Sequence, residues 1–323
     1  MMKRVLLTGA AGFIGFHVAK ALHARGDLVI GCDNFNSYYS VELKKERAAQ
    51  LEKLGIQVHL LDLKDKAAFD TFLNASRPTH VLHLAAQAGV RASLTHPQSY
   101  IDANITAFLN ILEGVRQHPH IPLIYASSSS VYGNNEKVPF SETDRVDNPA
   151  SLYAVTKKCG EQMAAVYHHL FGLHVTGLRF FTVYGEWGRP DMAYFSFVDK
   201  ILKGEPITLF NHGQMERDFT YISDIVDGVL KSLDLSAPHE IFNLGNNRPT
   251  PLKRFVEIIE QATGKKAQIN YLPMQQGDVL RTYADISHSQ QMLGFQPKTG
   301  LEEGIPRFVE WFLSYNNLTN KGL

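Results

Sequence analysis

The stretch RVLLTGAAGFIG, residues 4–15, decides the fold of this chain. Its first five residues contain the continuous apolar run Val5–Leu7, which is typical of a strand buried on both faces of a parallel sheet. Gly9, Gly12 and Gly15 follow at once and open an amphipathic stretch at Phe13 and Ile14. Glycine allows a tight turn, and backbone N–H groups at the start of a helix can approach a pyrophosphate. The stretch therefore predicts a nucleotide-binding strand, turn and helix, with a purely structural glycine turn as the alternative.

The same alternation of strand and helix continues outward over the first 180 residues. We expect nearly continuous apolar strands at 4–8, 28–33, 57–62, 80–85, 123–127 and 174–179. Amphipathic helices are expected between them at 13–25, 41–54, 67–74, 97–117 and 152–171. Because parallel strands need a crossover connection, this order predicts a doubly wound α/β (Rossmann) fold.

The pattern becomes less regular after residue 180. Helices are still expected at 195–203, 223–233, 252–263 and 300–315, with a short strand at 241–244. We expect the NAD-binding Rossmann domain to comprise residues 1–180 plus about 217–245. The remaining segments, about 181–216 and 246–323, are expected to form a smaller mixed α/β lobe that binds the substrate.

The composition argues against several classes of protein. With 32 Lys+Arg and 32 Asp+Glu, the formal net charge of the 323 residues is zero, which disfavours a nucleic-acid binder that must neutralise phosphates. No apolar run approaches the roughly 18 residues of a membrane span, and no signal-peptide layout precedes the first strand. Cys32 and Cys159 are too few for a disulfide framework or a cysteine zinc site, and the histidine clusters lack acids or cysteines at ligand spacing. We therefore expect a soluble, cytoplasmic protein without a metal site, whose partners are neither nucleic acid nor membrane.

Two acidic residues stand at the ends of predicted strands. Asp33 closes the second strand, where an acid accepts hydrogen bonds from the ribose hydroxyls of adenosine. Asn34 follows, and residues 34–36 include no arginine that would bind a 2′-phosphate, so we expect NAD rather than NADP. Asp62 and Leu63 end the third strand, where a carboxylate can reach the adenine amine; an ordinary surface aspartate is the alternative.

Tyr153 and Lys157 stand at the start of a predicted helix, at a spacing of four that places both on one face. A free tyrosine has a pKa near 10, so a phenol that acts as a base near pH 7 needs its pKa lowered by about 3. A neighbouring ammonium favours the phenolate, and a positively charged nicotinamide favours it further. The pattern alone is common. Here it follows a nucleotide turn and a serine-rich segment at the carboxyl end of the fifth strand, the edge where doubly wound sheets bind ligands.

Segments from most of the chain together carry a resemblance to a known family. They are residues 9–15, Asp33, Asp62 with Leu63, HLAAQ (83–87), SSSSVYG (127–133), YAVTK (153–157), RDFTYI (217–222) and FNLG (242–245). In this order they resemble the nucleotide-sugar branch of the extended short-chain dehydrogenase/reductase superfamily. The resemblance implies an NAD cofactor, a UDP-sugar substrate and a homodimer packed through the helices at 97–117 and 152–171. It also implies cofactor contacts from the glycine turn, from the strand ends and from Leu84, Ala85, Ala86, Gln87, Asn104, Ser127, Tyr153 and Lys157.

The same resemblance indicates the reaction. Related sugar 4,6-dehydratases carry an Asp-Glu pair just before the Val-Tyr-Gly of the serine-rich segment, and UDP-glucuronate decarboxylases carry a glutamate before that valine. Here these positions are Ser129 and Ser130, so reversible oxidation at C4 of the sugar is the simplest chemistry left. We therefore expect an isomerase, a 4-epimerase. Tyr153 takes the hydroxyl proton, NAD takes and returns the hydrogen, and Ser128 bridges Tyr153 and the substrate O4.

The sequence TVYGEWGRPDM that begins at Thr182 suggests the sugar. It resembles UDP-glucuronate 4-epimerases, as does QAGVR, which ends at Arg91, whereas UDP-galactose 4-epimerases usually have asparagine where Thr182 stands. The hydroxyl of Thr182 and the planar fork of Arg189 suit a C6 carboxylate. With the serines, they are expected to hold it away from the alignment that favours loss of CO2 from the 4-keto intermediate. An Arg189 paired with Glu186 or Asp191 is the alternative.

Arg217 is the cation that the resemblance assigns to the nucleotide diphosphate. Arg281 and Asp278 are expected beside it, although Gln275 stands where hexose epimerases often have arginine, so Arg217 is the stronger candidate. The favoured interpretation is a UDP-glucuronate 4-epimerase that makes UDP-galacturonate for surface polysaccharide. A 4-epimerase for UDP-glucose or UDP-N-acetylglucosamine, a UDP-glucuronate decarboxylase-like enzyme and a redox-dead NAD-binding regulator are the alternatives.

Overall fold

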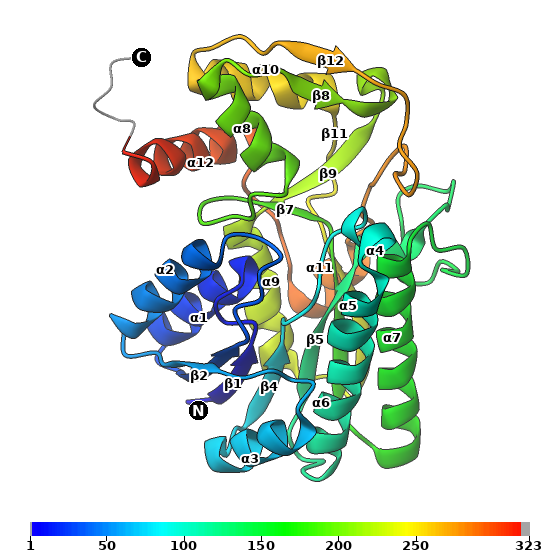
Figure 1. The fold of residues 1–323 in the computed structure, drawn as a ribbon. Helices are drawn as coiled ribbons and strands as arrows, with labels where there is room; N and C mark the ends of the chain where they lie inside the picture. Colours follow the sequence, from blue (N-terminus) through cyan, green and yellow to red (C-terminus); the bar gives the residue numbers. More distant parts are fainter. Residues whose placement is uncertain (1, 318–323) are drawn as a thin grey trace.

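The computed structural model describes residues 2–317, and at its centre lies a parallel β-sheet (Figure 1). Its seven strands follow the order β10-β6-β5-β4-β1-β2-β3, and every neighbouring pair is parallel. The strands are β1 (Arg4–Thr8), β2 (Leu28–Asp33), β3 (Val58–Leu60), β4 (His80–His83), β5 (Leu123–Ser128), β6 (Val175–Phe180) and β10 (His239–Leu244). The chain order reverses between β1 and β4, which is the switch point where such sheets bind ligands. The doubly wound α/β fold predicted from the sequence is confirmed.

Two sets of helices cover the two faces of this sheet (Figure 1). One face carries α1 (Phe13–Ala24), α2 (Val41–Glu52) and α9 (Ile222–Leu235); the other carries α3 (Lys66–Ser76), α5 (Pro97–Ile101), α6 (Ala107–Arg116) and α7 (Leu152–Phe171). Successive strand residues point to opposite faces. Val5 and Leu7 of β1 therefore pack with α1, whereas Leu6 packs with α3 and α6. Burial on both faces explains why these strands are apolar throughout.

After β6 the chain builds a smaller part with two further sheets. Strands β7 (Thr182–Tyr184), β9 (Glu216–Tyr221) and β11 (Pro249–Pro251) form one sheet, and β8 (Ile207–Leu209) and β12 (Ile269–Tyr271) form the other. Helices α8 (Ala193–Lys203), α10 (Leu252–Thr263) and α12 (Leu301–Tyr315) pack beside them. Aromatic pairs such as Phe219 with Phe255, whose ring centroids lie 4.4 Å apart, fill this part. Its core is continuous with the core under α1 and α9, so the smaller part is held firmly over the edge of the main sheet.

The structure differs from the sequence predictions in its shortest elements. The single helix expected at 97–117 is interrupted by a π-helical turn, Asp102–Thr106, between α5 and α6. The strands β7, β9, β11 and β12 and the helices α4 (Ala92–Thr95) and α11 (Ser287–Leu293) were not expected. Most of these elements are too short to show a period of hydrophobic residues. The π turn depends on a tertiary contact of Asn104, described below, that no local pattern encodes.

None of the helices within residues 2–317 combines the length and the apolar composition that crossing a membrane requires.

Candidate active site

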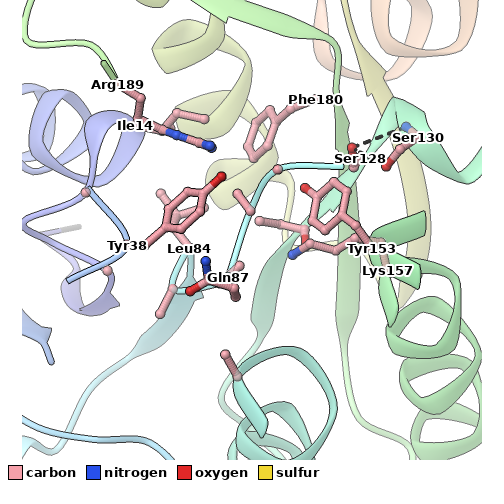
Figure 2. Close-up of a pocket in the computed structure, with 18 of the residues that line it drawn as sticks. Ile14, Tyr38, Leu84, Gln87, Ser128, Ser130, Tyr153, Lys157, Phe180 and Arg189 are labelled. Atoms are coloured by element: carbon pink, nitrogen blue, oxygen red, sulfur yellow. Dashed lines mark hydrogen bonds between the residues drawn. The ribbon is translucent and has the colours of Figure 1, made fainter. Parts of the chain in front are cut away.

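The carboxyl ends of the central strands open into one large cavity of about 560 Å³ (Figure 2). Its walls come from the glycine turn after β1, the ends of β2, β4, β5 and β6, the start of α7 and loops of the smaller part. Segments from both ends of the chain therefore meet in a single site.

The turn at residues 9–15 forms one end of this cavity. Gly9 has φ of +72° and donates its N–H to the carbonyl of Cys32 at 2.8 Å, so the turn is fixed on β2. A Cβ atom at position 15 would lie 2.0 Å from the carbonyl oxygen of Gly9. The N-cap residue of α1, Gly12, has no side chain to cap the helix. The turn thus offers a close approach to the backbone N–H groups of a helix N-terminus, which is the arrangement that binds a pyrophosphate.

Asp33 lies beside this turn at the end of β2. Its carboxylate accepts hydrogen bonds from the N–H of Ala11 at 3.1 Å and of Phe35 at 2.9 Å. Burial raises the pKa of this carboxyl, while these bonds and the Lys44 ammonium act in the opposite sense. Asn34 lies in the cavity wall with it. This placement suits the predicted contact with ribose hydroxyls, and a carboxylate there disfavours a 2′-phosphate.

Further expected cofactor residues line the same cavity. The wall includes Phe13, Ile14, Asp62, Leu63, Leu84, Ala85, Ala86, Gln87 and Ser127. Asn104 is different: it was expected to contact the cofactor, but it lies behind the wall. Its side chain bonds the N–H and the carbonyl of Gln87 at 2.8 and 2.9 Å and the hydroxyl of Thr156 at 3.0 Å. Asn104 therefore fixes the loop after β4 to α7 through the π turn, and a π turn at a functional site is common.

Tyr153 and Lys157 both face the cavity from the first turns of α7 (Figure 2). The helix starts with the N-cap Ser151, whose hydroxyl accepts the N–H of Ala154 at 3.2 Å. The Nζ of Lys157 donates to the carbonyl of Ala126 at 2.9 Å and lies 6.0 Å from the centre of the Tyr153 ring. Burial lowers the pKa of Lys157 to about 8, against the opposing charge of Glu161.

The protein's own groups do not lower the pKa of Tyr153 overall. Burial raises it, and the hydrogen bond with Ser128 and the charge of Arg189 only oppose that rise. In this structure the Lys157 ammonium donates to a backbone carbonyl of β5 and is not among the groups that lower the pKa of the phenol. The expectation that this ammonium makes the phenol acidic therefore stays a prediction.

The serine turn, Ser127–Tyr132, continues from the end of β5 along the cavity wall. Ser128 caps a short 3₁₀ helix, Ser129–Tyr132, and its hydroxyl accepts bonds from the N–H of Ser130 at 3.2 Å and the hydroxyl of Ser130 at 2.8 Å (Figure 2). Ser127, Ser128, Ser129 and Ser130 all line the cavity. The structure thus gathers four hydroxyls beside Tyr153, with no carboxylate at positions 129 and 130.

Arg189 enters the cavity opposite the serine turn, next to Tyr38 (Figure 2). Its guanidinium makes a two-pronged contact with Asp191, with Nε–Oδ1 3.0 Å and Nη2–Oδ2 2.5 Å. The hydroxyl of Tyr38 donates to the same carboxylate at 3.2 Å. The alternative considered from the sequence, an Arg189 paired within its own loop, is what the structure has. Thr182 lies in the wall as expected.

Of the other expected cations, only Arg217 lines the cavity. Its guanidinium donates to the carbonyls of Glu216 and Leu280, and burial lowers its pKa. Arg281 is ion-paired with Glu216 outside the wall, and Arg91 pairs with Asp278 at 3.1 Å over the ring of Phe210. Neither Arg281, expected beside Arg217, nor Arg91 of the QAGVR segment lines the cavity, because each is turned to an acid of the chain. That these two arginines contact the substrate stays a prediction. Asp278 itself lines the cavity.

Sequence reasoning missed part of the wall between β2 and α2. Tyr38, Tyr39 and Lys44 line the cavity there, as do Phe180, Met192 and Gly277 elsewhere. Arg47, which is fully buried, donates to the carbonyls of Ala11 and Trp187 and to the hydroxyl of Tyr39. It ties the glycine turn to the loop that carries Arg189. The only signal in the sequence is the spacing of Lys44 and Arg47, which places two cations on one helix face.

Across residues 2–317, no group of three or more His, Cys, Asp and Glu is arranged to hold a metal ion.

Comparison with known proteins places this site in a family. The model of the NAD dependent epimerase/dehydratase family matches residues 5–245, which is most of the chain. The chain belongs to this family. An NAD-dependent epimerase/dehydratase needs a dinucleotide site, and the glycine turn and Asp33 in the cavity wall fit NAD.

Individual members of the family are similar over nearly the whole chain. UDP-glucuronate 4-epimerase 1 of Arabidopsis thaliana is 50% identical over 98% of this chain and 78% of its own length. The crystal structure of UDP-glucuronic acid 4-epimerase from Bacillus cereus with UDP-glucuronic acid and NAD has a TM-score of 0.90 at 33% identity, covering 96% of this chain and 99% of that one. The UDP-glucose 4-epimerase of Thermus thermophilus with NAD has a TM-score of 0.87 at 30% identity, covering 96% and 98%.

Proposed function

We propose that this NAD-dependent enzyme interconverts UDP-glucuronate and UDP-galacturonate by inverting C4 of the sugar. The observation that carries the proposal is the meeting of Tyr153, Lys157 and the serine turn in one cavity, without a carboxylate at positions 129 and 130. Such a set can move one proton and orient one hydroxyl. It lacks the second acid–base pair that elimination of water needs.

The groups of the chain divide the work at C4. When bound, oxidised NAD supplies an acceptor for the C4 hydrogen and a positive charge. The phenol oxygen of Tyr153 takes the proton of the C4 hydroxyl and returns it after the keto-sugar has turned over. The hydroxyl of Ser128, held by Ser130, orients O4 beside the phenol. A positive charge next to Tyr153 offsets the rise that burial imposes on its pKa.

The C6 carboxylate distinguishes UDP-glucuronate from neutral UDP-sugars. Thr182, Ser129 and Ser130 present hydroxyls that donate hydrogen bonds to a carboxylate. Arg189 adds positive charge nearby, but its fork is already occupied by Asp191. We infer that neutral hydroxyls hold the carboxylate and that the Arg189–Asp191 pair closes the site around it.

The nucleotide end of the substrate is assigned to the smaller part. Arg217 is the only one of the four expected arginines that lies in the wall with its charge not taken up by a direct ion pair within residues 2–317. We infer that it binds the diphosphate. We propose that residues 1–180 with about 217–245 bind NAD and that about 181–216 with 246–323 bind the UDP-sugar. Arg217 is the exception at this boundary, because its strand β9 belongs to a sheet of the smaller part.

A homodimer is the second part of the proposal. The helices α6 and α7 expose large apolar side chains: Leu109 (40%), Val155 (41%), Val166 (50%), Leu170 (62%) and Phe171 (41%). Such a face is unusual on a monomer. Sedimentation of the wild type and of Leu170→Glu tests this assignment; a monomeric wild type contradicts it.

The function is tested by presenting purified protein and NAD with UDP-glucuronate, UDP-glucose and UDP-N-acetylglucosamine separately and resolving the products. We expect UDP-galacturonate as the main product of the first reaction and slow turnover of the other two. Faster inversion of a neutral UDP-sugar would favour the UDP-glucose or UDP-N-acetylglucosamine epimerase. A UDP-pentose as the main product would favour a decarboxylase. No turnover with any of the three contradicts the proposal.

A further inference from the structure

A buried ion pair lies directly beneath the serine turn. Glu161 of α7 and Arg179 of β6 are each 2% exposed. Nε and Nη2 of the arginine donate to the two carboxylate oxygens at 2.8 and 2.9 Å. Neither residue lines the cavity, so the pair has no direct contact with a ligand there.

The pair holds the serine turn at both of its ends. At the start of the turn, the hydroxyl of Ser127 donates to Glu161 at 2.7 Å. At its end, Arg179 donates to the hydroxyl of Tyr132 at 2.9 Å. That hydroxyl in turn donates to Asn243 of β10 at 2.7 Å. Of the four serines that line the cavity, the three that follow Ser127 lie between these two anchors.

Two other side-chain contacts of the turn involve Ser128. Its bonds with Ser130 shape the turn internally, and its hydrogen bond with Tyr153 is the contact with α7 whose geometry the pair would set. Glu161 follows Tyr153 on α7 at a spacing of eight, which is two steps of the i, i+4 pattern and lies on the same side of the helix. The carboxylate therefore links the serine hydroxyls to the helix that carries the phenol.

We propose that the Glu161–Arg179 pair is a clamp that sets the position of Ser128, Ser129 and Ser130 relative to Tyr153. The clamp acts through positioning residues, which orient the groups for proton transfer at O4 and for binding of the C6 carboxylate. These residues are Ser127, Tyr132, Glu161 and Arg179. The inference rests on the proposed function. A loosened turn lets the 4-keto sugar acid rotate, so the C5–C6 bond breaks, CO2 leaves and C5 takes a proton, which yields a UDP-4-keto-pentose. Return to C4 of the hydride that NAD had accepted then gives a UDP-pentose.

Small substitutions test the clamp without leaving a buried charge unpaired. Tyr132→Phe and Ser127→Ala each remove one hydroxyl from one end of the turn. The matched control is Tyr125→Phe, a buried tyrosine of β5 whose hydroxyl has no hydrogen-bond partner within residues 2–317.

We expect each test variant to lower kcat for UDP-glucuronate about tenfold, because small displacements of positioned groups slow proton transfer. KM should change less than about twofold, since the substrate contacts remain, and the UDP-pentose fraction should rise. The control should match the wild type.

A second measurement is independent of turnover. Hydrogen exchange of the peptide that covers residues 127–133 reports how firmly the turn is held. We expect faster exchange in Tyr132→Phe and Ser127→Ala than in Tyr125→Phe. Equal exchange in all three overturns the clamp, and so does faster exchange with unchanged kcat and product ratio. If the wild type does not act on UDP-glucuronate, the proposed function fails while the exchange result still decides whether the pair holds the turn.

Discussion

The two halves of the cavity are built differently. The half beside β1 and β2 is built on a glycine turn fixed to Cys32 and on the carboxylate of Asp33, with Tyr38, Tyr39 and Lys44 in the wall next to them. The half beneath the smaller part presents long side chains, and three of the four arginines expected there, all but Arg217, are held by acids of the chain itself. Arg189 pairs with Asp191, for example.

This difference shows how each half meets its ligand. Backbone N–H groups at a helix start are rigid and have no alternative partners, so that half is complete before a ligand arrives. Arginine side chains in the other half must be shared with or released from their acids. Affinity for NAD should therefore depend on the shape of the glycine turn. Affinity for the sugar nucleotide should depend on the arginines whose charge is not already neutralised by an acid of the chain.

The largest effect is expected where the two halves meet. Tyr153→Phe removes the phenol oxygen that moves the proton, so kcat should fall by about a thousandfold with little change in KM. Steady-state rates with UDP-glucuronate measure this. Tyr167→Phe, at the far end of α7 where the hydroxyl bonds Glu113, is the control and should leave kcat unchanged. A Tyr153→Phe variant that still turned over at the wild-type rate would leave the phenol without a role.

We expect the buried ammonium of Lys157 to make the stability of the protein depend on pH. Burial lowers the pKa of this ammonium to about 8 in the folded protein, from the ordinary value of 10.5. Between these values the unfolded chain binds more protons, so the unfolding free energy should rise as pH goes from 8 to 10.5, by up to about 3 kcal/mol. Urea unfolding across this range should show a larger rise in the wild type than in Lys157→Met, which keeps the rise due to Lys44, whose pKa burial also lowers to about 8. Parallel pH curves would contradict the buried ammonium.

The half of the cavity that is built on the glycine turn is tested by a substitution that adds only a methyl group. Gly15→Ala places a Cβ 2.0 Å from the Gly9 carbonyl oxygen, so the turn must shift and NAD affinity should fall on the order of a hundredfold. Calorimetric titration with NAD measures it. Gly300→Ala, where the new Cβ meets its nearest neighbour at an ordinary 3.5 Å, should bind NAD normally. Unchanged affinity in Gly15→Ala would mean that the turn does not hold the pyrophosphate.

The smallest effect is a difference in KM between variants of two arginines of the smaller part. Arg217→Ala removes a cation that lines the cavity and should raise KM for the UDP-sugar about tenfold. Arg281→Ala removes one that is paired with Glu216 on a partly exposed surface, so KM should change less than about twofold. Equal effects, or a larger one at Arg281, would reverse the assignment of the diphosphate.

The same contrast explains what the sequence could predict. The glycine turn, Asp33 and the shared face of Tyr153 and Lys157 follow from local spacing, because each depends on residues within one strand–helix unit or one helix. The partner of Arg281 could not be predicted, since it lies far away in the chain and is brought close only by the fold.

Tertiary contacts explain the remaining misses. Asn104 bonds Gln87 through a π turn that no hydrophobic period reveals. The pKa of Tyr153 depends on how deeply the phenol is buried and on where the Lys157 ammonium points. Strands of three residues such as β7 form only because a neighbouring strand is already in place.

The most direct test of the central claim follows one hydrogen atom. UDP-glucuronate carrying deuterium at C4 is incubated with the wild-type protein and NAD, and the products are resolved by mass spectrometry and NMR. The account predicts UDP-galacturonate that keeps the deuterium at C4, because the hydrogen removed from one face of the sugar is returned to the other within the closed site. Absence of UDP-galacturonate, or its formation with the deuterium lost to water, would contradict it.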